Sequence, residues 1–268
     1  MTTAKKDDMP EVIAEVMRHP PSEVCLSIIT ARDVHKAKAL AHLPVHVKIF
    51  EDTFELLVNA IHGLNFAKKE NWKQHNTLQV VFLSKVPKTL FSAFQQIIHG
   101  DYFEALATCR IVYETLLRVC FIEKSPEHQF STIKAEKGCT QFTPTNFLRD
   151  TLKVIDEDPF YEFLSFSVHS NKYPVLKDMF KSQQNGGLLL DLGFEYNEKY
   201  LQVSFNTLIV ITYLAGRLFQ GLFNSHLAET RSELKKMNAI EILVRDMPNE
   251  FNTIPGLIEK ILEKLRSG

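Results

Sequence analysis

The chain has 268 residues, and its 31 Lys and Arg against 32 Asp and Glu give a formal net charge of -1. This balance argues against a protein that binds nucleic acid by overall charge, and the 45% of apolar residues argues against general disorder. With only 10 glycines and as many as 20 phenylalanines, the composition favours helices around a large core over a turn-rich β-sandwich.

Helical periodicity runs through the first hundred residues, and prolines and a glycine interrupt it. The helices expected there are 10–18, a second that Ser22 caps and that ends near His42, 41–69 and 78–99. Pro44 interrupts the third near its start, and Pro87 marks either a kink or a fresh start in the fourth. Gly100 then ends this stretch, because glycine is the usual residue just after a helix.

The next helix has the clearest beginning. Asp101 is its expected N-cap, and Glu104 three residues later completes a capping box, in which each residue satisfies a free backbone N–H. We expect the helix over Tyr102–Lys124. Its residues are apolar nearly all round, which places it at the centre of the protein.

The rest of the chain is also predicted to be mainly helical, with polar loops over 125–141 and 171–187. The helices expected there are 143–156, 158–170, 198–224, 225–247 and 254–266. Residues 188–196 alternate weakly, which suggests a short β-hairpin with a turn at Gly186-Gly187. The short connections between the central helices favour antiparallel neighbours in a bundle.

These elements predict an all-α protein: a helical bundle of about five core helices, with flanking N- and C-terminal helices and one short β-hairpin. The expected units are an N-terminal helical extension (1–41), a bundle core (42–225) and a C-terminal helical pair (226–268). The longest apolar run, 203–223, contains Arg217 and Gln220. Both are costly at the centre of a bilayer, so we expect a buried helix and no membrane partner.

The compartment is predicted from the cysteines and from the first residues. Cys25, Cys109, Cys120 and Cys139 form no CxxC pair. Cys109 and Cys120 fall nearly on one face of a helix and are interpreted as small buried hydrophobic residues. Residues 1–11 lack the apolar stretch of a signal peptide. We therefore expect a reducing, cytoplasmic compartment.

Arg110 and Glu114 lie one turn apart on the apolar face of the helix 102–124. Burying either charge alone would cost several kcal/mol, so they are expected to pair with each other or with a third group. One interpretation is an arginine positioned for an anion or a substrate. The favoured interpretation is a structural ion pair that fixes the register of the helix.

A second polar cluster falls on the helix 158–170. Glu162, Ser165 and His169 lie on one side of it, opposite a broad aromatic face. A Ser–His or Glu–His unit of this kind could do acid–base work near neutral pH. The favoured interpretation is a solvated polar face, with the histidine at the helix C-terminus, where a cation is stabilised.

Two further polar patterns have low specificity. The otherwise apolar helix 204–224 has a narrow polar stripe: Asn206, Tyr213, Arg217, Gln220 and Asn224. The stripe lines a pocket or a partner surface, or it is the one face that meets water, which is favoured. His42 and His46 have a spacing that can ligate zinc, but Pro44 lies between them. No metal and no cofactor are predicted, since phosphate-loop and Rossmann motifs are also absent.

Two segments resemble a known family. They are YFEALATCRIVYE, from Tyr102 to Glu114, and YEFLSFSVHS, from Tyr161 to Ser170. Together they resemble a mainly bacterial family of helical proteins of unknown function, which pairs an Arg…Glu helix with a later Ser…His helix. That family is distantly similar to HEPN-type domains. The resemblance covers roughly residues 45–225.

The resemblance implies that Arg110, Glu114, Ser165 and His169 face one another across the bundle core. It also implies a homodimer, because HEPN-like domains often dimerise through long helices. HEPN ribonucleases usually carry a histidine five to seven residues after an arginine, and no arginine of this chain has one. The resemblance therefore informs the fold more than the function.

The leading hypothesis is a cytosolic helical interaction or ligand-binding protein without catalysis, in a bacterial defence or stress system. Arg110, Glu114 and His169 would form its anion-binding or structural centre, and a protein partner or a second copy is expected. The alternative is a divergent HEPN-like, metal-independent ribonuclease, with His169 as acid–base group and Arg110 stabilising the phosphorane. A hydrolase using Ser165 with His169 is a weaker third hypothesis. Whether the protein is an enzyme stays open.

Overall fold

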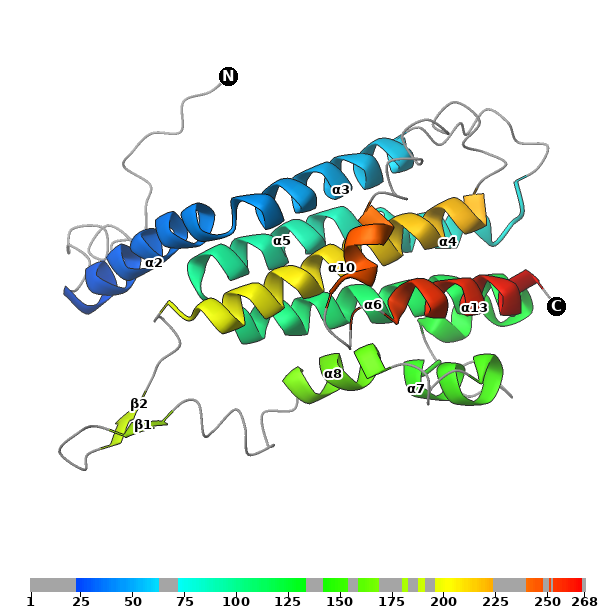
Figure 1. Cartoon of the computed structure of the whole chain (residues 1–268). Helices are drawn as coiled ribbons and strands as arrows, with labels where there is room; N and C mark the ends of the chain where they lie inside the picture. Colours follow the sequence, from blue (N-terminus) through cyan, green and yellow to red (C-terminus); the bar gives the residue numbers. More distant parts are fainter. Residues whose placement is uncertain are drawn as a thin grey trace, which may run out of the picture.

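The structure is a computed structural model of the chain. It describes residues 23–62, 72–133, 142–153, 159–168, 180–182, 188–190, 196–223, 240–247, 251 and 253–266. The α-helices are α2 (Glu23–His42), α3 (Pro44–His62), α4 (Asn76–Leu83), α5 (Val86–His99), α6 (Tyr102–Lys124), α7 (Pro144–Asn146), α8 (Pro159–Val168), α10 (Glu198–Phe223) and α13 (Ile254–Arg266). The predicted all-α helical bundle is confirmed (Figure 1).

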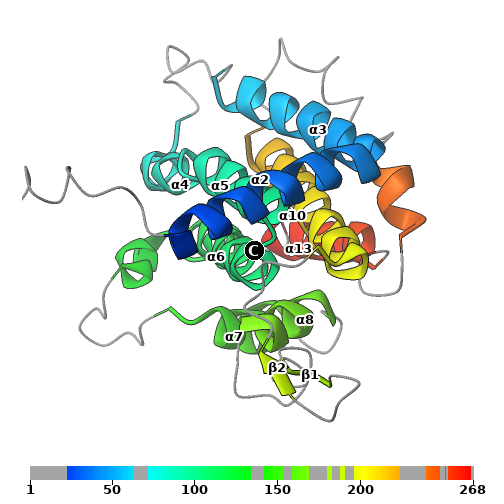
Figure 2. The same ribbon diagram turned by 90° about the vertical axis from the view of Figure 1, so that its left-hand side faces the viewer.

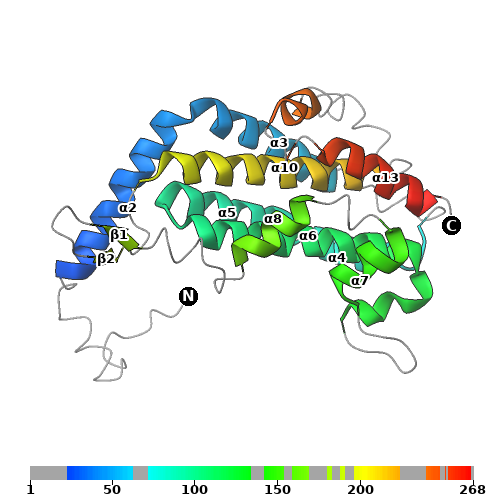
Figure 3. The ribbon, with the colours of Figure 1, turned by 60° about the horizontal axis from the view of Figure 1, so that its bottom comes forward.

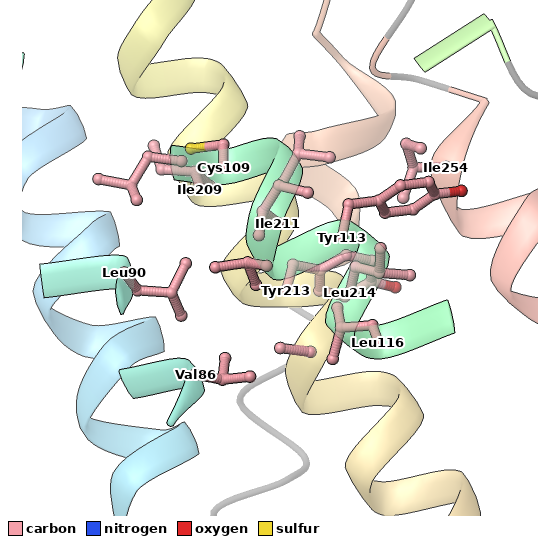
Figure 4. Packing of buried hydrophobic residues seen from close by; sticks show 14 of the residues in the cluster. Val86, Leu90, Cys109, Tyr113, Leu116, Ile209, Ile211, Tyr213, Leu214 and Ile254 are labelled. Carbon is pink, nitrogen blue, oxygen red and sulfur yellow. The ribbon is translucent and has the colours of Figure 1, made fainter. Parts of the chain in front are cut away.

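The helix α10 is the centre of this bundle. It packs against α3, α5, α6 and α13, and the view along the bundle shows it among these four helices (Figure 2). In the core, Cys109 and Tyr113 of α6 lie close to Ile209 and Tyr213 of α10 (Figure 4). The helix α6 is equally surrounded, by α4, α5, α8 and α10. Its predicted central place is therefore confirmed, and Cys109 and Cys120 are fully buried as expected.

Of the described helices, α10 alone is long and apolar enough to cross a membrane by length and composition. In its most apolar window, 83% of the residues are buried inside the protein. Burial against four neighbouring helices satisfies the same apolar surface that a bilayer would otherwise cover. This agrees with the prediction of a buried helix.

The helix boundaries follow the local breakers closely. The chain leaves the helix at Leu43, and α3 begins at Pro44. Pro87 stands in the first turn of α5, so it marks a fresh start rather than a kink. Gly100 adopts the left-handed conformation with φ 90°, which ends α5. Glycine adopts this conformation without strain because it has no Cβ atom.

The predicted capping box at the start of α6 is wrong. Asp101 is the N-cap residue, but its side chain makes no capping hydrogen bond. Its carboxylate instead forms an ion pair with Arg32 of α2. A charged partner from another helix holds the carboxylate more strongly than a neutral backbone N–H of its own helix, because both groups of the ion pair are charged.

The helix expected over 143–156 is also different. Only three residues of α7 are α-helical, and a π-helical turn, η4 (Phe147–Leu152), follows directly. Lys153 then adopts a positive φ of 56°, which ends the helical stretch. In the polar segment after α6, a 3₁₀ helix, η3, covers Pro126–Thr132.

The remaining expectations are met in part. Two short strands, β1 (Phe180–Ser182) and β2 (Leu188–Leu190), pair antiparallel, so the hairpin strands flank Gly186-Gly187. Residues 240–245 are helical within the predicted helix 225–247. The helix expected over 10–18 and the segments 63–69 and 225–239 lie outside the described residues.

Candidate functional site

The predicted ion pair on α6 is present. Arg110 Nε donates to Glu114 Oε1 at 2.8 Å, and the two side chains are 18% and 22% exposed. The Arg110 guanidinium lies over the ring of Tyr161 on α8, 5.8 Å from its centroid. The charge of Arg110 is therefore balanced by Glu114 and covered by an aromatic ring. This geometry supports the structural interpretation of the pair.

The second predicted cluster is described only in part. On α8, Phe160, Tyr161 and Leu164 are buried, which agrees with the predicted aromatic face. Glu162 is exposed and Ser165 is half-buried. The group of α8 that covers Arg110 is the ring of Tyr161. His169 lies outside the described residues, so the predicted meeting of His169 with Arg110 and Glu114 stays a prediction.

The polar stripe of α10 packs against other parts of the protein. Tyr213 donates its hydroxyl proton to Glu241 Oε2 at 2.6 Å, and Arg217 lies 3.9 Å from the same carboxylate oxygen. Burial and this hydrogen bond raise the pKa of Tyr213. Further along, Asn206 is buried and hydrogen-bonds to His46. At Asn206 and Tyr213 the stripe is an internal packing surface rather than a solvated face, whereas Arg217 also lines a hollow of about 430 Å³.

His42 and His46, whose spacing could suit zinc, contact different partners. His42 Nε2 lies 2.9 Å from Glu198 Oε1, at the start of α10. His46 lies against Phe205 and Asn206 further along α10. The break between α2 and α3 at Leu43 separates them. Within the residues that the structure describes, no group of three or more His, Cys, Asp or Glu side chains could hold a metal ion.

A third polar centre, at the C-terminal end of α6, was missed by the sequence reasoning. Glu123 is mostly buried there and accepts three hydrogen bonds. Lys73 Nζ donates to its Oε1 at 3.0 Å, and the side chains of His75 and Gln79 each contact its Oε2 at 3.1 Å. Burial alone would raise the pKa of Glu123, but these three hydrogen bonds lower it. Glu123 is therefore an ionised carboxylate held in a fixed position.

The chain before α4 builds the support for Glu123. The backbone N–H of Lys73 donates to Asn76 Oδ1 at 2.8 Å, and Asn76 Nδ2 donates to Gln79 Oε1 at 2.7 Å. Gln79 Nε2 also donates to the carbonyl oxygen of Val119 at 3.2 Å. One signal of this centre was present in the sequence. An acid in the last turn of a helix is unfavourable unless other groups compensate for it.

A cleft of about 610 Å³ opens beside Glu123. One wall comes from Lys73 and from the end of α6 and the turn after it; the other comes from the ends of α10 and α13. Its lining residues are Lys73, Glu123, Lys124, Pro126, Glu127, Gly221, Leu222, Leu262, Leu265 and Arg266. Figure 3 shows the ends of α10 and α13 together at one end of the molecule. A second hollow of about 430 Å³ shares Leu262 and Arg266 with this cleft.

Comparison of the chain with protein-family models, with curated proteins and with solved structures found no match. The resemblance to a helical family with HEPN-like features therefore remains an expectation from the two sequence segments. The candidate site rests on the geometry of the described residues, and we take the cleft beside Glu123 as its centre.

Proposed function

We propose that this protein is a helical ligand-binding protein without catalysis, and that the cleft beside Glu123 is its binding site. The observation that carries the proposal is a cleft of ligand size in which hydrogen bonds already fix part of the polar lining, the side chain of Glu123. Binding sites for small molecules usually measure about 300–1,000 Å³ and contain a few well-placed polar groups. The cleft has this size, and three donors fix Glu123 before any ligand arrives.

The cleft combines both kinds of surface that a small organic ligand needs. Leu222, Leu262 and Leu265 are half-buried and offer apolar contact area. Charged side chains of α6 and α13 stand around them. Because Glu123 is held by hydrogen bonds, little conformational entropy remains to be lost there on binding.

The Arg110 centre supports binding rather than catalysis. A ribonuclease that used Arg110 for the phosphorane would need its guanidinium free to face the phosphate. In this structure Glu114 and Tyr161 already occupy it. The ribonuclease alternative can be tested directly. It predicts that the protein cleaves RNA and that His169→Ala abolishes this cleavage while the protein stays folded.

The binding function is tested by filling the cleft. Leu265→Trp places a large side chain in it, whereas Val81→Trp places the same side chain on an exposed position of α4. A thermal-shift screen of small metabolites is run on the wild type and both variants. We expect compounds that raise the melting temperature of the wild type and of Val81→Trp but not of Leu265→Trp. Compounds that act equally on Leu265→Trp, or a screen without any hit, would overturn the proposal.

Native mass spectrometry of the full chain, purified without nuclease treatment, complements the screen. A co-purified small molecule that is lost in Leu265→Trp supports the cleft as the site. Bound RNA that survives in Leu265→Trp would contradict it. We further propose a reducing cytosolic compartment, which the free, buried thiols of Cys109 and Cys120 support.

A further inference from the structure

We infer that the ligand of this cleft carries an anionic group, a carboxylate or a phosphate, which binds between Lys124 and Arg266. The inference rests on the proposed binding function and adds the chemical class of the ligand. It depends on which charges of the cleft are already balanced and which are not.

Glu123, one of the two acids that line the cleft, is already compensated. Glu123 has Lys73 on one oxygen and the side chains of His75 and Gln79 on the other. A ligand cation would have to compete with the Lys73 ammonium for this carboxylate. The other acid of the lining, Glu127, is largely exposed to water, as Arg266 is, so an ion pair with either contributes less to binding than one with a buried group.

Two cations of the cleft are not balanced in this way. The Lys124 side chain is half-buried, and its ammonium donates to the uncharged carbonyl oxygen of Lys264 at 2.9 Å. Arg266 is exposed and lines both the cleft and the neighbouring hollow, which Glu259 and Glu263 also line, and it forms no ion pair with any residue that the structure describes. The Lys124 ammonium lines the cleft without a carboxylate partner, and a charge-assisted hydrogen bond to an anion would be stronger than its present bond to a carbonyl oxygen.

The two cations stand close together in the fold. The hydrogen bond to Lys264 places the Lys124 ammonium on the last turn of α13, two residues before Arg266. Lys73 donates a hydrogen bond to Glu123, which is the residue before Lys124 on α6. Three cations thus line one cleft from three separate parts of the chain. The C-terminal dipoles of α6 and α13 favour a cation on each helix, but they do not require both to face the same cleft.

The wall formed by α10 and α13 sets the second property of the ligand. Leu222, Leu262 and Leu265 offer an apolar surface on this wall, next to Arg266. An inorganic anion would leave this surface in contact with water. We therefore expect an organic anion, whose apolar part covers the leucines and whose charged group meets Lys124 and Arg266.

The test uses probes that differ only in their charged group. Hexanoate, hexyl phosphate, hexylammonium and hexanol share one apolar chain, and ligand-observed NMR measures their binding to the full chain. We expect hexanoate and hexyl phosphate to bind, and their relative affinity separates a carboxylate site from a phosphate site. Binding of hexylammonium or hexanol as strong as that of hexanoate would overturn the inference.

Variants then locate the anion. Lys124→Gln and Arg266→Gln remove one cation each, and Lys88→Gln removes an exposed lysine of α5 outside the cleft. We expect the double variant of Lys124 and Arg266 to weaken hexanoate binding at least tenfold and Lys88→Gln to leave it unchanged. Arg266 is exposed, so Arg266→Gln serves as a test even if Lys124→Gln unfolds the protein. Unchanged hexanoate binding in Arg266→Gln and in the double variant would contradict the inference.

Failure of the inference differs from failure of the proposed function. If hexanol binds to the wild type as strongly as hexanoate does, and does not bind to Leu265→Trp, the cleft is a binding site. The inference that its ligand carries an anionic group is then wrong. If no probe distinguishes the wild type from Leu265→Trp, and the metabolite screen gives no hit either, the cleft is not a binding site.

Discussion

At the scale of single residues, the half-buried charges of this protein are satisfied in two different ways. Arg110 and Glu114 satisfy each other within one helix, and Tyr161 covers them. Glu123 instead collects donors from a segment more than 40 residues away. Both arrangements remove the cost of leaving a charge unpaired in a partly dry environment.

Arg110→Ala should destabilise the fold by about 1–3 kcal/mol, because it leaves Glu114 unpaired and removes the contact with Tyr161. The expected value lies between those of exposed and buried pairs, since both side chains are about one-fifth exposed. Urea unfolding measures it. As a matched control, Arg149→Ala breaks an exposed pair with Asp150 and should cause no measurable change. Equal effects of the two variants would show that the Arg110 pair is solvated.

His35 should make stability depend on pH. Its side chain is buried between the carbonyl oxygen of Ile98, 2.9 Å from Nδ1, and the hydroxyl of Tyr102, 2.7 Å from Nε2. The carbonyl only accepts, so Nδ1 carries the proton and Nε2 accepts from Tyr102. Burial lowers the pKa of His35. The hydrogen bond to Ile98 and the charge of Asp101 raise this pKa, but burial has the larger effect.

Because the folded state resists protonation, the unfolded state binds a proton first as the pH falls below 6.5. The contribution of neutral His35 is present above that pH and is lost as the pH falls towards the lowered pKa of the folded state. Burial lowers the pKa of His46 as well. We therefore expect the free energy of unfolding to decrease between pH 7.5 and 5.5, and His35→Gln to flatten this dependence. His62→Gln, at an exposed histidine, should leave it unchanged.

At the scale of the elements, the close approach of α10 and α13 shapes one wall of the cleft. A Cβ atom at Gly221 would lie 2.5 Å from Leu262 Cδ2, so any larger residue there would require the Leu262 side chain to shift. The same two residues line the cleft. A change in the distance between α10 and α13 would therefore also change the shape of the proposed site.

Gly221→Val should force Leu262 out of place and destabilise the fold by about 1–3 kcal/mol, the usual cost of overpacking. Leu262→Ala removes the atoms that a new side chain would meet. The double variant should therefore be more stable than the sum of the two single changes predicts. Thermal unfolding of the four proteins gives this comparison. Strict additivity would show that Gly221 and Leu262 are not in contact.

At the scale of the whole molecule, the three predicted units share one core. Ala39 of α2, the central helices, Val244, and Ile258 of α13 all belong to one cluster of buried residues. The ends of the chain that the structure describes thus pack on the bundle rather than forming cores of their own.

We therefore expect the described bundle to unfold as one unit. The single tryptophan, Trp72, lies beside Phe223 at the end of α10, with ring centroids 6.2 Å apart. Its fluorescence reports on this end of the bundle, while circular dichroism reports on all helices. The two signals should change at the same urea concentration. A loss of helix signal before the change in fluorescence would show that a flanking unit unfolds by itself.

The sequence by itself determined the fold class and most helix boundaries. Pro44, Pro87 and Gly100 act on their own backbone, and the apolar periodicity of α6 and α10 is local, so both can be read without the tertiary structure. It also determined the pairing of Arg110 with Glu114, because residues four apart on a helix are neighbours in any fold.

Only the tertiary structure decided which groups meet across long separations. Asp101 pairs with Arg32 instead of capping α6, and Glu123 receives its donors from the segment before α4. The cleft exists because the ends of α6, α10 and α13 come together, and it brings Lys124 and Arg266 to one place. Such meetings depend on how the helices rotate and pack against one another, which local periodicity does not specify.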